Sequence, residues 1–146
     1  MSFTKHARIG GVLLVAALLA ACAHHEVLTN DGLSVSVRQM VDCGKSTAGH
    51  MRWRLLELRV GHGSRLRIEQ SRLGADGSWR SSGAAIVDPS AEDGVPRKLR
   101  GLRCEIVGEG LKVNAGAEDR HQENMFHLEV IVHDDLTTEI KQYFLS

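Results

Sequence analysis

The sequence WRLLELRVGHGSRLRIEQSRL, which runs from Trp53 to Leu73, predicts a β-hairpin. It contains two segments in which apolar and polar residues alternate, Trp53–Val60 and Arg65–Leu73, and a Gly-His-Gly sequence at 61–63 separates them. Short loops that contain glycine commonly connect antiparallel strands in this way.

A three-residue loop at 61–63 sets the expected pairing of the two strands. Leu58 then lies opposite Leu66 and Leu56 opposite Ile68, so these four side chains form the core face of the hairpin. Glu57 lies on the other face, opposite an arginine. The arginines of the hairpin that are expected to point away from the core are Arg59, Arg65 and Arg67.

Similar alternation continues on both sides of the hairpin. Ser34–Cys43 alternates, and Met125–His133 places four apolar side chains on one face. Further strands are expected to begin at Trp79 and to cover Ala84–Val87, Arg97–Val107, Leu111–Val113 and Thr138–Leu145. No segment after residue 25 keeps a helical spacing of apolar residues over three turns. The sequence therefore predicts an all-β fold over residues 33–146, a single antiparallel β-sandwich of about seven or eight strands, with a small β-barrel as the alternative.

The hairpin is followed by a second turn, Gly74-Ala75-Asp76-Gly77, and by Trp79. This arrangement resembles the central hairpin of small immunoglobulin-like periplasmic lipoproteins. The resemblance covers roughly 25 residues and implies a sandwich fold.

The N-terminus has the layout of a secretory signal peptide. Lys5 and Arg8 precede an apolar run, Ile9–Ala21, which is too short to cross a bilayer as a helix. Leu19-Ala20-Ala21-Cys22 resembles the lipobox of bacterial lipoproteins. The resemblance implies that a signal peptide at 1–21 is removed, that Cys22 is acylated, and that residues 22–32 form a lipidated tether. The alternative is an ordinary cleavage site with a chance cysteine nearby.

The residue after Cys22 bears on the membrane of destination. In lipoproteins of Gram-negative bacteria an Asp at this position is typical of retention in the inner membrane, and here it is Ala23. The resemblance therefore implies an outer-membrane protein that faces the periplasm.

The charge of the chain is balanced. The sequence has 18 Lys and Arg and 18 Asp and Glu, and removal of the signal peptide takes away only Lys5 and Arg8. The mature chain is then slightly acidic, with both signs mixed along it, which gives no electrostatic argument for a nucleic-acid partner.

Cys43 and Cys104 are the two cysteines that remain after Cys22. Exported proteins fold in an oxidising compartment, and both cysteines share strand parity with apolar neighbours. The sequence therefore predicts a disulfide between them. A metal site and a reactive thiol are the alternatives, although neither cysteine lies in a Cys-x-x-Cys motif.

Other patterns give weak indications of chemistry. His127, Glu129 and His133 share a strand face and could contribute to a metal site, but a solvated outer face is the favoured explanation. The segment Asp88–Pro96 lacks the ligand series of a calcium loop. The segment 97–103 is locally basic, but its alternation divides the charges between two faces.

No nucleophile, phosphate-loop or cofactor motif is present, so we expect neither an enzyme nor a cofactor.

The remaining hypothesis is a binding protein. Trp53 and Trp79 flank the hairpin and could anchor a partner, although core positions would also explain them. The three hairpin arginines could meet an acidic partner, or only keep the sheet soluble. We expect a non-enzymatic subunit that binds or assembles with another envelope protein. The alternatives are a periplasmic inhibitor of a cell-wall lysozyme and a periplasmic hydrolase.

Overall fold

The structure is a computed structural model, and it describes residues 27–28, 34–119 and 124–145. The expected signal peptide and Cys22 lie outside the described residues, and so does most of the expected tether. In the described part of the chain, no helix has the length and apolar character needed to cross a membrane.

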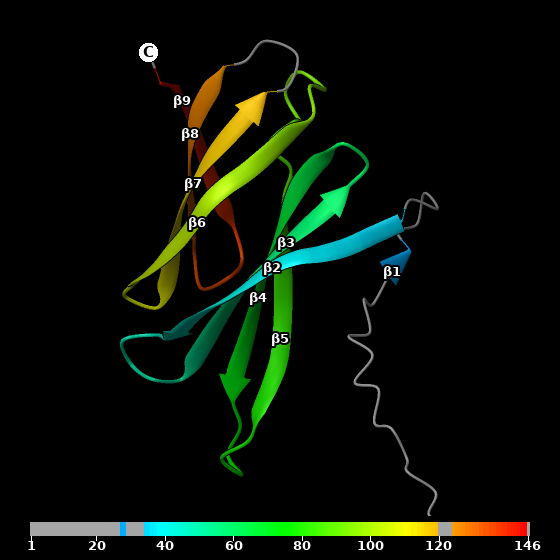
Figure 1. Cartoon of the computed structure of the whole chain (residues 1–146). Coiled ribbons are helices and arrows are strands. Elements are labelled where there is room, and N and C mark those ends of the chain that lie inside the picture. The colour runs from blue at the N-terminus through cyan, green and yellow to red at the C-terminus, as the bar shows by residue number, and fades with distance from the viewer. Residues whose placement is uncertain (1–26, 29–33, 120–123, 146) are drawn as a thin grey trace, which may run out of the picture.

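The described residues form nine strands in two antiparallel sheets. One sheet has the order β1-β2-β3-β4-β5 and the other has the order β6-β7-β8-β9 (Figure 1). The strands are β1 (Val27–Leu28), β2 (Ser34–Lys45), β3 (Met51–Val60), β4 (Gly63–Leu73), β5 (Trp79–Val87), β6 (Arg97–Val107), β7 (Gly110–Asp119), β8 (Met125–Val132) and β9 (Thr138–Phe144). Neither sheet closes on itself, so the predicted β-sandwich is confirmed and the barrel alternative is wrong.

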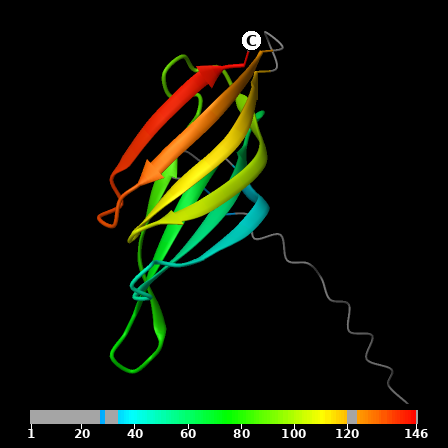
Figure 2. The ribbon, with the colours of Figure 1, turned by 90° about the vertical axis from the view of Figure 1, so that its left-hand side faces the viewer.

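The topology is simple, because within each sheet the described strands pair in the order in which they follow one another in the sequence. The chain passes from the first sheet to the second through the connection between β5 and β6. In Figure 2 the second sheet lies in front of the first, and the β4–β5 turn extends below both. The β4–β5 hairpin therefore projects from one end of the sandwich.

The core lies between the two sheets. It is formed by inward-facing side chains of both sheets, among them Trp53, Leu55, Leu66, Ile68, Leu111, Val113, Leu128 and Val130, all of which are fully buried. Burial of apolar surface in this layer is the main force that holds the sheets together.

A disulfide adds a covalent link between the sheets. Cys43 of β2 and Cys104 of β6 are bonded, with their Cα atoms 5.8 Å apart, which confirms the predicted bridge. Thr47 N–H also donates a hydrogen bond to the Gly108 carbonyl, at 2.9 Å, near the same edge.

The hairpin that the sequence predicted is present, but its predicted register is wrong. Val60 pairs with Gly63, so the loop has two residues, and Gly61 adopts φ +58 in its first position as a type II′ turn requires. The shift by one residue exchanges the faces of β3. Trp53 and Leu55 enter the core, whereas Leu56 and Leu58 lie half-buried on the outer face.

The shift also places Glu57 in the interior. Glu57 is opposite Leu66 instead of an arginine, and it is only 3% exposed. Its carboxylate accepts a hydrogen bond from Ser64 Oγ at 2.7 Å. A buried carboxylate needs such partners, because burial without a hydrogen bond is costly.

Three further strands differ from the prediction, two in their extent and one in its regularity. The two short strands expected near Trp79 and at Ala84–Val87 form one strand, β5, which contains an irregularity opposite Gln70 and Ser71. Strand β7 continues well beyond Val113, because small residues maintain its alternation: Ala115 and Ala117 are buried in the core. Finally, β6 contains a bulge between Arg100 and Arg103.

Candidate functional site

Trp53 does not lie on the surface. Its side chain is completely buried, and Nε1 donates a hydrogen bond to the Glu109 carbonyl at 3.2 Å. Since a buried indole needs a partner for its N–H, this contact fits a core role. The structure therefore places Trp53 in the core and removes it from the candidate binding surface.

Trp79 is half-buried at the beginning of β5, next to the projecting β4–β5 turn. Lys45 Nζ lies 5.6 Å from the centre of its ring, within the range of a cation–π interaction. Leu73 pairs with Trp79 across the hairpin and is largely exposed. Trp79 is therefore partly accessible beside the β4–β5 turn.

Arg65 and Arg67 lie on the outer face of the first sheet, as the sequence predicted, but they are ion-paired. Arg65 Nε is 2.9 Å from Asp88 Oδ2, and Arg67 Nε is 2.9 Å from Glu69 Oε1. Arg54 also donates to Glu69, with Nε at 2.8 Å from Oε2. The arginines are therefore held in place by carboxylates and do not form a bare cationic strip.

The pKa values of these carboxyl groups reflect the pairing. Burial raises the pKa of Glu69, but hydrogen bonds from Arg54 and Arg67 outweigh it, so the pKa lies below its usual value. Burial also raises the pKa of Asp88, and hydrogen bonds from Ser90 and Arg65 bring it below its usual value. Both groups are thus stabilised as carboxylates in the folded protein.

Apolar side chains surround the paired arginines. Across the sheet, Met40 pairs with Leu56, Leu56 with Arg67, and Arg67 with Ile86, so one row of side chains crosses β2 to β5. Met40 is 60% exposed and Ile86 is 53% exposed. We call the outward-facing apolar residues near this row the outer-face patch; its members are Val37, Met40, Leu56, Leu58 and Ile86.

A shallow polar hollow of about 490 Å³ adjoins the outer-face patch. It lies between Met40 and Trp79, and its lining includes the ion pair of Arg52 with Asp42. The hollow therefore extends from the outer-face patch to the region of Trp79, beside the β4–β5 turn.

Arg59 is separated from the other two hairpin arginines. Because of the corrected register it points away from the face of Arg65 and Arg67, and it lines a different hollow of about 330 Å³. The basic residues that line this second hollow, which we call the cationic hollow, are Arg38, Arg59, His62 and Lys98. No pattern in the sequence indicated that Arg38 would join this group.

The basic side chains of the segment 97–103 differ in burial, and they also lie on different faces of the sheet. Arg97 is only 5% exposed; it donates hydrogen bonds to the Pro89 carbonyl and to Asp93, and its Cζ lies 4.5 Å from the centre of the Phe126 ring. The β6 bulge shifts the alternation after Arg100, so Arg97 and Arg103 do not share a face. Arg97 therefore fixes the β5–β6 connection and does not contribute to a basic stripe.

The histidines that the sequence singled out have ordinary partners. His127 Nε2 lies 3.2 Å from Asn114 Oδ1, and His133 Nε2 lies 3.0 Å from Glu139 Oε1. Glu129 is paired with Lys112 at 2.9 Å. Among the residues that the structure describes, no group of three His, Cys, Asp or Glu side chains could hold a metal ion.

Comparison of the chain with protein-family models, with curated proteins and with solved structures found no match.

Proposed function

We propose that this protein is a lipid-anchored envelope protein whose β-sandwich binds another protein through the outer-face patch. The observation that supports the proposal is the row from Met40 to Ile86, in which two largely exposed apolar side chains flank an arginine. Contiguous apolar surface bordered by polar residues is typical of interaction sites on soluble domains.

The paired arginines favour recognition of a protein. Arginine is enriched at protein interfaces, together with methionine and aromatic residues. Since Glu69 already orders Arg54 and Arg67, less side-chain entropy is lost when a partner binds. The partner surface we expect is apolar at its centre, with polar groups that accept hydrogen bonds from the arginine rim.

Site-specific photocrosslinking tests this proposal. The photoreactive residue p-benzoylphenylalanine is placed at Met40 or Ile86, and at Glu105 as the control on the outer face of the second sheet. We expect one discrete protein adduct from both patch positions and none from Glu105. Met40→Gln in the chain labelled at Ile86 should reduce the adduct. Equal labelling from all three positions would contradict the proposed site.

The anchor is the second part of the proposal. We infer from the lipobox resemblance that Cys22 carries the lipid and that the domain faces the periplasm from the outer membrane. Two or more acyl chains hold a protein stably on a bilayer, whereas one holds it only marginally. Without the anchor, the domain would not stay near envelope partners.

Cys22→Ser tests the anchor directly. The serine variant should lose incorporation of radiolabelled palmitate and should leave the membrane fraction, because no other group near the cleavage site takes its place. Cys43→Ser is the control for loss of a cysteine, and it should keep the label. Equal labelling of the Cys22→Ser chain would refute the lipoprotein assignment.

A further inference from the structure

The cationic hollow lies at the end of the first sheet that is opposite the β4–β5 hairpin. It forms where the beginning of β2, the β3–β4 turn and the beginning of β6 meet. Its lining residues are Ser36, Val37, Arg38, Arg59, His62, Gly63 and Lys98. None of these described lining residues is acidic.

Arg38 is positioned by a β-bulge. The pairing between β2 and β3 skips Arg38, because Val37 pairs with Leu58 and Gln39 with Glu57. Its Nη1 lies 3.8 Å from the buried Glu57 carboxylate, while about half of its side chain remains exposed. Bulges of this type often redirect a side chain toward a functional site.

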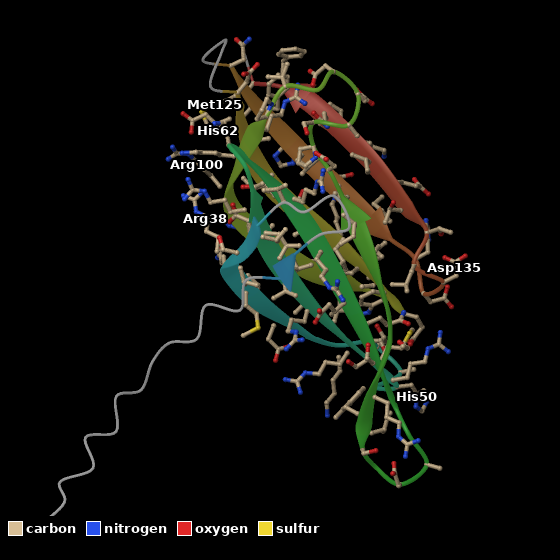
Figure 3. The ribbon with its side chains drawn as sticks, turned by 90° about the vertical axis from the view of Figure 1, so that its right-hand side faces the viewer. Arg38, His50, His62, Arg100, Met125 and Asp135 are labelled. Atoms are coloured by element: carbon tan, nitrogen blue, oxygen red, sulfur yellow. A yellow bond between two sulfur atoms is a disulfide. The ribbon has the colours of Figure 1, made fainter. Side chains whose placement is uncertain are left out.

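Arg59 and Lys98 complete the positive surface. Within the described part of the chain, Arg59 forms no ion pair, and its side chain is exposed. Lys98 reaches the hollow from the other sheet. Figure 3 shows Arg38 and His62 on the same side of the molecule, with His50 toward the opposite end. The lining therefore includes three side chains with a permanent positive charge, Arg38, Arg59 and Lys98.

The hollow is close to the expected anchor along the chain. Strand β1 pairs with Ser34 and Val35, directly before the three β2 residues that line the hollow. Cys22 precedes Val27 by five residues, and five residues span at most about 17 Å when extended. A lipid on Cys22 would therefore keep this end of the sandwich near the bilayer surface.

We propose that the cationic hollow binds the phosphate headgroup of anionic membrane lipids, and this inference rests on the proposed lipidation of Cys22. Guanidinium groups hold phosphate oxygens through paired hydrogen bonds, and basic residues near an anionic bilayer strengthen attachment. The bound headgroup fixes the orientation of the domain, because it adds a second contact beside the lipid anchor.

Calorimetric titration of the full chain in a neutral detergent tests the proposal. The three ligands are dihexanoyl phosphatidylglycerol, dihexanoyl phosphatidylcholine and inorganic phosphate. We expect phosphatidylglycerol to bind most tightly. Equal affinity for phosphatidylcholine would overturn the charge argument, and equal affinity for inorganic phosphate would overturn the assignment to a lipid.

Two variants locate the site. Arg38→Gln/Arg59→Gln/Lys98→Gln should weaken phosphatidylglycerol binding by about a hundredfold at low ionic strength. The matched control, Lys45→Gln/Arg72→Gln/Arg80→Gln, removes the same charge at the other end and should bind like the unmodified protein. If both variants lose the same affinity, the hollow is not the site.

A single substitution keeps the test decisive if the triple variant does not fold. Arg59 is exposed, and Arg59→Gln alone should weaken binding by about fivefold. Unchanged affinity of this variant would overturn the proposal. The titration does not require acylated Cys22, so its failure is distinguishable from the failure of palmitate labelling.

Discussion

Leu136 and Gly83 form a close contact between the two sheets. Leu136 lies in the β8–β9 turn with φ +67, which is unusual for a leucine, and Gly83 of β5 has φ +152. A Cβ atom on Gly83 would lie 2.5 Å from Leu136 Cδ1. The leucine therefore packs into space that only glycine leaves free.

Gly83→Ala is expected to lower the free energy of unfolding by about 1–3 kcal/mol, because the new methyl group overpacks the contact and its backbone angle is strained. Urea denaturation measures the loss. In the Leu136→Ala background the same substitution should cost less, since the colliding side chain is gone. An equal cost in both backgrounds would show that the contact with Leu136 is unimportant.

Glu69 is a residue whose titration should couple to stability. Its pKa is lowered in the folded protein from the usual 4.5, because the hydrogen bonds from Arg54 and Arg67 outweigh burial. A lowered pKa means that its contribution to folding is present above pH 4.5 and is lost as the pH falls through the folded value.

Glu69→Gln should therefore reduce the free energy of unfolding at pH 7 and leave a smaller further loss on acidification. Denaturant titrations at pH 7 and near pH 3 provide the comparison. Glu92→Gln changes an exposed carboxyl group and serves as the control. A Glu69→Gln variant with the same acid sensitivity as the unmodified protein would contradict this assignment.

Among the structural elements, the link between β2 and β6 combines two kinds of interaction. The Cys43–Cys104 bond joins positions 61 residues apart, and both cysteines pack against the apolar core. Closing a loop of this length restricts the unfolded chain more than the folded one. The bridge should therefore stabilise the sandwich and hold the two sheets in alignment.

The variant Cys43→Ala/Cys104→Ala is expected to lose about 2–5 kcal/mol of stability. Adding a thiol reductant to the unmodified protein should lower its stability toward that of the variant, whereas the variant should not respond. Thiol counting on the unfolded, unreduced protein should detect neither Cys43 nor Cys104. A reductant effect of equal size in both proteins would exclude the bridge as its cause.

The strands could be predicted because their alternation is clear, but the hairpin register could not. Leu55, Leu56 and Leu58 offer apolar side chains on both faces, so either register of β3 buries leucines. The two-residue turn and the burial of Trp53 decide between them. A shift by one residue moves every side chain of the strand to the opposite face. The predicted register therefore placed Leu56, Leu58 and Glu57 on the wrong faces together.

The candidate site was accessible to sequence reasoning only in part. Arg65 and Arg67 were expected on the surface, and the structure places them there. Their ion pairs with Asp88 and Glu69 depend on strand pairing that the register error obscured. The cationic hollow depends on the bulge at Arg38 and on the approach of β6, and neither leaves a pattern within a single strand.

At the scale of the whole molecule, the charged and apolar features are separated in space. The cationic hollow lies at the end of the β3–β4 turn, near the expected anchor. The β4–β5 hairpin projects from the other end (Figure 1). The outer-face patch lies on the strands between these ends. In a domain that is anchored at Cys22 and held through the hollow, the outer-face patch would face along the plane of the membrane, neither toward the bilayer nor away from it. The hairpin turn would then point away from the membrane.

This orientation can be measured on the lipidated protein in vesicles that contain phosphatidylglycerol. A fluorescent amino acid is introduced at His62, in the β3–β4 turn, or at Ala75, in the β4–β5 turn, because both positions are exposed. Headgroup spin-labelled lipid should quench the fluorophore at 62 strongly and the fluorophore at 75 weakly. In vesicles of phosphatidylcholine alone, the difference should shrink, since the hollow loses its ligand and only the lipid on Cys22 holds the domain to the membrane. Stronger quenching at 75 than at 62 would invert the proposed orientation and would place the hairpin, instead of the hollow, against the membrane.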